Sequence, residues 1–121
     1  EDLEDYLLLD ARESEEYQVS HIAKAKHVGY DEFDIKELDH VRKNERIVVY
    51  CSVGYRSEKI GEKLKKAGFA EVSNLYGGIF EWVNQGQPVV DKDGRPTENI
   101  HAYSKTWGIW LTRGNKVYDS K

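Results

Sequence analysis

One seven-residue segment, residues 51–57, combines the residue types needed for nucleophilic chemistry on a small anion. It reads Cys-Ser-Val-Gly-Tyr-Arg-Ser and holds the chain's only cysteine. A cysteine thiolate is a nucleophile, and the Arg56 guanidinium can bind an oxyanion through two parallel hydrogen bonds. Gly54 lets the backbone curve tightly between them. The segment therefore predicts transfer chemistry on a small anionic group, of either sulfur or phosphorus.

The flanking residues place this segment at a turn from a strand into a helix. Residues 47–50 form an apolar run typical of a buried strand, and residues 58–67 predict an amphipathic helix with Ile60 and Leu64 on its core face. The free amides and dipole of a helix N-terminus favour negative charge, hence the thiolate form of the cysteine. Ser57 is expected to cap this helix rather than to act as a catalyst.

Further strands and helices are predicted on both sides of this turn, with strands at 7–9, 25–28 and 72–75 and helices at 13–19, 31–41 and 78–86. Strands that alternate with helices predict an α/β fold, with a central parallel sheet covered by helices on both faces.

A C-terminal helical extension is expected after the turn-rich residues 86–96. Thr97 would cap this helix, and five apolar residues recur along one helical face: Ile100, Tyr103, Trp107, Trp110 and Leu111. We expect this face to pack on the main domain, with a partner or dimer surface as the alternative. The expected division is a domain over residues 1–90 and an extension over residues 91–121.

Composition narrows the possible partners and cofactors. A chain of 121 residues is typical of one domain. Its single cysteine excludes an internal disulfide, a C-x-x-C pair and a cysteine zinc cluster, and His27, His40 and His101 have no metal-ligand spacing. We therefore expect no cofactor or metal. No apolar stretch approaches a membrane span, and no dense Lys/Arg cluster indicates nucleic acid. A free thiol favours a reducing compartment, so a cytoplasmic location is expected.

Four segments, in order, resemble the rhodanese-family sulfurtransferases. Residues 51–57 are similar to that family's Cys-x-x-Gly-x-Arg-Ser loop, and residues 8–13 are similar to its Leu-(Leu/Ile)-Asp-Val-Arg-Glu strand end. Residues 17–25 resemble its Glu-(Tyr/Phe)-x-x-Gly-His-Ile-Pro-Gly-Ala stretch, and residues 75–82 resemble its Leu-x-Gly-Gly-x-x-x-Trp segment. The resemblance covers about residues 7–90 and implies a rhodanese-like fold.

This resemblance implies a catalytic role for Cys51. In the family, the thiolate takes the outer sulfur of a donor such as thiosulfate, becomes a persulfide, and passes the sulfur to cyanide or another thiol. The implied anion-binding loop consists of Ser52, Val53, Gly54, Tyr55, Arg56 and Ser57. Arg56 would hold the donor's sulfonate or anchor the loop, and Tyr55 would face either solvent or the pocket rim. Asp10 and Arg12 are expected near this loop, with a structural ion pair as an equal alternative.

The sequence departs from the family pattern in two places. The family's Gly-His-Ile-Pro-Gly reads Ser-His-Ile-Ala-Lys over residues 20–24, and we expect this to change the loop geometry but not the chemistry. His21 is expected to fix a loop, as it does in the family, rather than to act as a base. The family's first strand, before Leu7, is missing or truncated.

Three other functions compete with that of a thiosulfate sulfurtransferase. A related dual-specificity phosphatase needs five residues between its cysteine and arginine, whereas four separate Cys51 from Arg56. A non-catalytic interaction module commonly loses the cysteine, which is present here. A persulfide carrier, which takes sulfur from a protein and delivers it to a biosynthetic partner, uses the same loop. The sequence leaves the carrier and the thiosulfate enzyme open.

Overall fold

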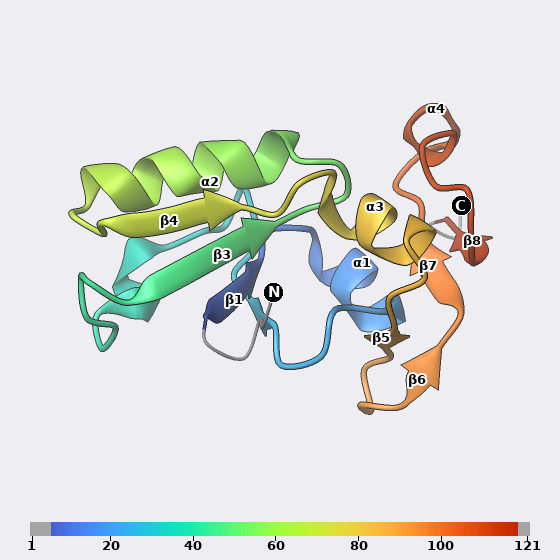
Figure 1. Ribbon diagram of the computed structural model, residues 1–121, viewed down its shortest axis with the longest axis horizontal. Helices are drawn as coiled ribbons and strands as arrows, with labels where there is room; N and C mark the ends of the chain where they lie inside the picture. Colours follow the sequence, from blue (N-terminus) through green and yellow to red (C-terminus); the bar gives the residue numbers. More distant parts are fainter. Residues whose placement is uncertain (1–5, 119–121) are drawn as a thin grey trace.

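A four-stranded parallel sheet forms the centre of the computed structural model, which describes residues 6–118 (Figure 1). Its strands are β1 (Leu7–Asp10), β2 (Lys26–His27), β3 (Arg46–Tyr50) and β4 (Glu71–Asn74). They lie in the order β2-β1-β3-β4, and every neighbouring pair is parallel. The carboxyl ends of β1, β3 and β4 therefore meet at one edge of the sheet, where open α/β folds place their sites.

Side chains that alternate along the strands supply a core on each face of the sheet. In register, Leu8 pairs with Val48 and Leu9 pairs with Val49. Leu8 and Val48 belong to one buried apolar cluster, and Leu9 and Val49 belong to the other. This alternation follows from the two-residue period of a strand. Both faces are thus covered, which confirms the predicted α/β class with a central parallel sheet.

The helices are α1 (Ser14–Val19), α2 (Tyr55–Lys66) and α3 (Gly78–Asn84), with a 3₁₀ turn, η2 (Ile35–Leu38). Ile60 and Leu64 of α2 pack in the Leu9 cluster, whereas Ile79 of α3 packs in the Leu8 cluster. The helices predicted over residues 13–19, 58–67 and 78–86 are confirmed, with ends that agree to within three residues.

Two helix predictions were wrong in detail. The helix expected over residues 31–41 is only η2, capped by the Asp34 side chain, which accepts a hydrogen bond from the Lys36 amide. Ser57 does not cap α2, because the helix begins earlier, at Tyr55, with Gly54 as its cap residue. Gly54 has φ of +133°, a conformation that glycine adopts at little cost and that lets the chain turn into the helix three residues sooner.

The predicted C-terminal helix is not present. The chain instead forms a hairpin of β5 (Val89–Val90) and β6 (Pro96–Thr97), then pairs β7 (Asn99–His101) in parallel with β8 (Asn115–Val117). The one helix in this region of the described chain is α4 (Lys105–Gly108), capped by Ser104. Long-range strand pairing therefore overrides the helical spacing of the apolar residues.

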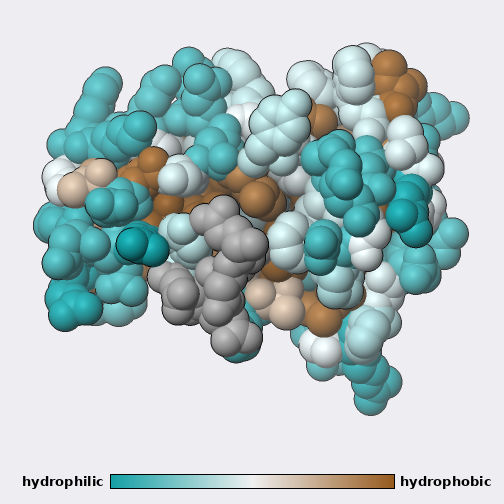
Figure 2. All heavy atoms as spheres, viewed as in Figure 1, coloured by the Kyte–Doolittle hydropathy of each residue, from teal (hydrophilic) through white to brown (hydrophobic). Residues whose placement is uncertain are grey.

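The segment after residue 90 nevertheless shares the core. Ile100, Ala102 and Leu111 are buried in the same cluster as Leu8 and Ile79. The boundary between residues 1–90 and 91–121 remains a prediction. Figure 2 shows a mostly hydrophilic face with several small apolar areas, one of them over α4. Ile109, which follows this helix, is exposed. None of the helices in residues 6–118 is long and apolar enough to cross a membrane.

Candidate functional site

The Cys51 thiol lies at the carboxyl end of β3, directly before the turn into α2. Its side chain is buried, and the Gly54 amide donates a hydrogen bond to the sulfur at 3.1 Å. Because a backbone amide keeps its donor fixed, this contact stabilises negative charge on the sulfur without any proton transfer. The turn of the backbone at Gly54 thus brings its amide onto the Cys51 sulfur.

Ser57 and Asn74 support the loop from its far side. The Ser57 hydroxyl lies 3.6 Å from the Cys51 sulfur and 2.6 Å from the Asn74 side-chain oxygen. Asn74, at the end of β4, also donates to the Gly54 carbonyl at 3.0 Å. A hydroxyl has one proton, so the short contact with Asn74 competes with donation to sulfur. Ser57 therefore links the loop to β4 as well as bordering the thiol.

The N-terminus of α3 is hydrogen-bonded to the loop that contains Cys51. The amides of Ile79 and Phe80 donate to the carbonyls of Cys51 and Ser52 at 2.8 and 3.0 Å. A Cβ at Gly78 would lie 2.5 Å from both of those carbonyl oxygens. Gly78 is therefore needed for the close approach of α3 to the loop.

The Arg56 guanidinium is bound by a carboxylate of the protein itself. Its two terminal nitrogens donate to the two Glu16 oxygens, each at 2.9 Å, and one also donates to the Ser52 hydroxyl at 3.0 Å. Burial alone would raise the pKa of Glu16, but the hydrogen bonds and charge of Arg56 outweigh it and lower the pKa. Of the two roles predicted for Arg56, the geometry corresponds to anchoring of the loop.

Asp10 and Arg12 form a separate, fully buried ion pair. Arg12 donates to both Asp10 carboxylate oxygens and to the Ser20 carbonyl. Burial raises the pKa of Asp10, and the charge and hydrogen bonds of Arg12 reverse this and lower it. One terminal nitrogen of Arg12 has no hydrogen-bond partner among the described residues. Neither side chain lines the Cys51 pocket, so the structural ion pair is the arrangement present.

A pocket of about 300 Å³ opens above the thiol. The lining residues are Glu13, Tyr30, Asp31, Cys51, Ser52, Val53, Tyr55, Arg56, Tyr103 and Trp107. Tyr55 is largely exposed at the rim, so it faces both solvent and pocket. The Tyr103 ring lies against the Arg56 guanidinium, with the guanidinium carbon 4.7 Å from the ring centroid. The pocket therefore combines a buried sulfur with an aromatic entrance.

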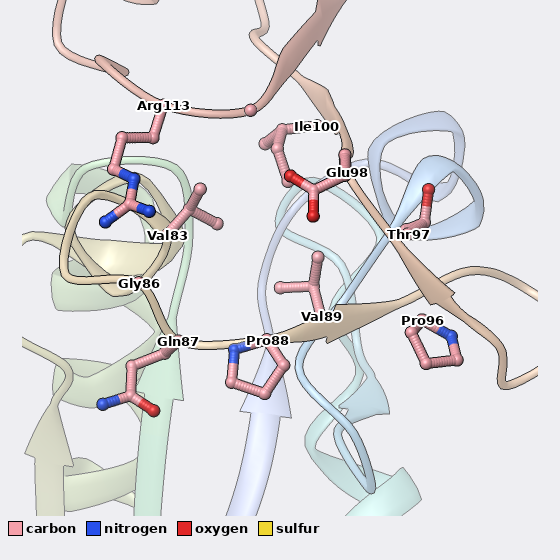
Figure 3. A pocket seen from close by; sticks show the side chains of 11 residues that line it. Val83, Gly86, Gln87, Pro88, Val89, Pro96, Thr97, Glu98, Ile100 and Arg113 are labelled. Carbon is pink, nitrogen blue, oxygen red and sulfur yellow. The ribbon is translucent and has the colours of Figure 1, made fainter.

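A second pocket, of about 340 Å³, lies between the end of α3 and residues 96–114 (Figure 3). Arg113 reaches into it from one side and Glu98 from the other. It contains neither Cys51 nor any part of the 51–57 loop. Because the nucleophile is elsewhere, the Cys51 pocket is the candidate functional site.

The loop over residues 20–24, which lacks the family's glycines, still contains a residue with the positive φ angle that glycine favours. Lys24, at the position of the family's second glycine, has φ of +72°, which a non-glycine residue adopts at a cost of about 1 kcal/mol. His21 stacks on Tyr17 at 3.8 Å between ring centroids and lies 3.0 Å from the Tyr17 carbonyl through Nδ1. His21 thus fixes this loop in the described structure, and it does not line the Cys51 pocket.

Several site residues were missed from the sequence. Glu16 carried no signal in the sequence, because an acidic residue in the first turn of a short helix is more often exposed than buried. Asn74 and Gly78 lie close to the loop only because β4 and α3 follow β3 in space. Tyr103 and Trp107 were assigned to a packing helix, and their place at the pocket entrance depends on a chain path that local patterns do not encode.

Comparison with known proteins relates this chain to sulfur-transfer proteins and to larger enzymes. It is 40% identical over 83 residues to a tRNA uridine(34) hydroxylase of Aster yellows witches'-broom phytoplasma, covering 64% of this chain and 27% of that protein. It is 35% identical over 78 residues to the putative sulfur carrier protein YrkF of Bacillus subtilis, covering 64% and 42%. The chain therefore spans less than half the length of either relative.

Solved structures show the same fold. The chain superposes on the thiosulfate sulfurtransferase of Pseudomonas aeruginosa with a TM-score of 0.65 and 25% identity, over 88% of this chain and 20% of that one. It superposes on the BH2092 protein of Bacillus halodurans with a TM-score of 0.67 and 26% identity, over 75% and 67%. The model of the rhodanese-like domain family matches residues 1–85, and the chain therefore belongs to the rhodanese-like domain family.

Proposed function

We propose that this protein is a sulfurtransferase that moves sulfane sulfur from thiosulfate or a persulfide donor to a thiophilic acceptor through a persulfide on Cys51. The observation that carries this proposal is the buried Cys51 sulfur at the base of the pocket, 3.1 Å from the donating Gly54 amide. A terminal persulfide sulfur is anionic and needs hydrogen-bond donors more than a base. The family membership of the chain supports the same chemistry.

The proposed reaction has two balanced steps. The Cys51 thiolate attacks the outer sulfur of the donor, so that a bond from Sγ to that sulfur forms while the donor's own sulfur–sulfur bond breaks. The leaving group is sulfite from thiosulfate, or a thiolate from a persulfide. The acceptor, cyanide or a thiol, then takes the outer sulfur and restores the Cys51 thiolate. No oxidant, reductant or cofactor enters either step.

An intact-mass measurement tests this proposal. The protein is weighed before and after incubation with thiosulfate or with a persulfide, and again after cyanide. We expect a gain of one sulfur atom that cyanide removes as thiocyanate, and no gain in a Cys51→Ser variant. Because Cys51→Ser changes one atom in a buried side chain, its fold should be unchanged by circular dichroism. A Cys51→Ser variant that still transfers sulfur would contradict the proposal.

A persulfide carrier that serves a biosynthetic partner is the second candidate. The similarity to the putative sulfur carrier protein YrkF favours it, and the carboxylate already bound to Arg56 leaves this arginine less able to hold a sulfonate. Single-turnover loading separates the two candidates, because a carrier should load from persulfides much faster than from thiosulfate. Faster loading from thiosulfate would favour the enzyme.

A phosphatase has less support. Four residues separate Cys51 from Arg56, and both terminal nitrogens of Arg56 are engaged by Glu16. If the protein hydrolysed an aryl phosphate and a Cys51→Ser variant did not, the phosphatase would become the better-supported function.

A further inference from the structure

The pocket above Cys51 carries negative charge that its own cation does not offset. Among the described residues that line it, Arg56 is the one cation, and Glu16 binds that guanidinium through both oxygens. The charge of Arg56 still acts on Glu13, but with this guanidinium bound to Glu16, the carboxylates Glu13 and Asp31 leave the pocket lining with an excess of negative charge. Lys59 is not part of the lining, and its ammonium lies 5.7 Å from the centroid of the Tyr55 ring.

A neighbouring depression extends this acidic surface. It shares Glu13 and Tyr30 with the Cys51 pocket and adds Glu15 and Glu32, all of them acidic except the tyrosine. The Arg12 that also lines it is paired with Asp10. The pKa of Glu13 is raised by partial burial and by the charge of Asp31, which together outweigh the lowering effect of the Arg56 charge. An approaching dianion such as thiosulfate meets this surface at the pocket entrance.

The same entrance is aromatic, and part of it comes from outside the segment matched by the family model. Tyr103 and Trp107 follow residue 85, lie edge to face with 6.4 Å between their ring centroids, and both line the pocket. Tyr103 has φ of +71°, a strained conformation that persists only where the surrounding structure holds it. Aromatic faces beside carboxylates are the combination that binds organic cations.

We propose that this pocket selects a sulfur donor that carries an ammonium or guanidinium group beside its persulfide, with Glu13, Asp31, Tyr103 and Trp107 as the specificity-determining side chains. This inference rests on the proposed function, because it concerns which persulfide loads Cys51. The donor's terminal sulfur bonds to Sγ, its sulfur–sulfur bond breaks, and the donor leaves as a thiolate. Meanwhile its cation lies between the carboxylates and the aromatic rings.

Matched donors of opposite charge test the selection. Cysteamine persulfide has an ammonium where 3-mercaptopropionate persulfide has a carboxylate, and two persulfidated peptides have lysine or glutamate on both sides of their cysteine. The rate of loading of Cys51 is measured by intact mass for each pair. Differences in intrinsic reactivity cancel when the ratio of the cationic to the anionic rate is compared between wild type and variant.

The Glu13→Gln, Asp31→Asn double variant should reduce this ratio at least about fivefold, as expected for two partly screened carboxylates. Trp107→Ala should reduce it about threefold through loss of a cation–π contact, whereas Tyr103 is kept because its ring already contacts the Arg56 guanidinium. Glu71→Gln is the matched control, since Glu71 is an exposed carboxylate at the opposite end of the sheet, and its ratio should equal that of wild type.

A salt titration of the wild-type protein gives an independent test. The ratio should fall as the salt concentration is raised from about 10 to about 500 mM, because salt in this range screens the charge of exposed carboxylates.

The outcomes separate the two proposals. Discrimination by both donor pairs supports a cationic donor of any size, and discrimination by the peptides alone assigns the cation to a polypeptide. A ratio that neither the variants nor salt changes would overturn the inference and leave the proposed function intact. If no donor of either charge loads Cys51, the proposed function itself fails, and this inference with it.

Discussion

Two arginine–carboxylate pairs lie near the carboxyl edge of the sheet, and they differ in what surrounds them. Arg12 and Asp10 are both fully buried, whereas the Arg56 side chain, bound to Glu16, keeps 12% of its surface exposed at the pocket. The first pair joins the end of β1 to the Ser20 carbonyl after α1. The second joins α1 to the loop that holds the cysteine. The Arg12–Asp10 pair therefore stabilises the fold, whereas the Arg56–Glu16 pair positions the candidate active loop.

This contrast explains why the two pairs should respond differently to mutation. Removal of one partner of a fully buried pair leaves an uncompensated charge with no access to water. At the pocket, water can enter and solvate whichever partner remains, so the cost in stability is smaller. The effect on sulfur transfer should have the opposite order, because only the Arg56 pair touches the loop.

Arg12→Ala is expected to have the largest effect on stability. It leaves the Asp10 carboxylate buried and unpaired, which should lower the free energy of unfolding by about 3–5 kcal/mol. Urea denaturation followed by circular dichroism measures this loss. Arg12→Met keeps much of the side-chain volume and separates lost charge from lost packing. A loss below 1 kcal/mol for Arg12→Ala would contradict a structural role for this pair.

Arg56→Ala should cost less stability and more activity. Loss of its three charge-assisted hydrogen bonds should lower the free energy of unfolding by about 1.5–3 kcal/mol. The loop then loses its link to α1, so loading of Cys51 should slow with every donor by a similar factor. Arg56→Lys is the control for charge, because lysine lacks the two-pronged geometry. A selective loss with thiosulfate alone would show that Arg56 binds the sulfonate instead.

Glu16→Gln sharpens the comparison at the pocket. The amide keeps the shape of the side chain but removes the charge that offsets Arg56, so the pocket becomes less negative. We expect a loss of about 1 kcal/mol in stability together with faster loading from thiosulfate. Slower loading from thiosulfate would mean that the position of Arg56, and not its charge, limits the reaction.

Lowering the pH should weaken both ion pairs and so decrease the stability of the fold in both cases. The pKa values of Asp10 and Glu16 are lower in the folded protein than their ordinary values of 3.8 and 4.5. The stability that they contribute is therefore present above pH 4.5 and is lost as the pH falls through their folded values. Denaturation from pH 7 to pH 3 measures this slope, which should be shallower in Glu16→Gln.

Glu13 should show the opposite dependence, because its pKa is raised in the folded protein. Its ionised form costs stability at neutral pH, and protonation recovers it as the pH falls through the folded value. Glu13→Gln should therefore be slightly more stable than wild type at pH 7, and the difference should vanish at low pH. This is the smallest of the expected effects, and a less stable variant at pH 7 would contradict it.

The amino-acid sequence by itself determined the sheet, the strand-to-helix turn and the position of Cys51 in that turn. These features depend on local patterns: the apolar run before Cys51, the glycine at residue 54 and the amphipathic spacing of Ile60 and Leu64. Strands, turns and helices can be predicted from such patterns because the residues that form each element are neighbours in the sequence as well as in space.

Only the tertiary structure decided the partners of Arg56 and the entrance to the pocket. Glu16 lies 40 residues from Arg56 in sequence, and Tyr103 lies farther still. The apolar spacing of residues 100–111 predicted a helix, but pairing of β7 with β8 determined the path that brings Tyr103 and Trp107 to the thiol. Contacts between distant segments depend on how the whole core packs, and no window of the sequence contains that information.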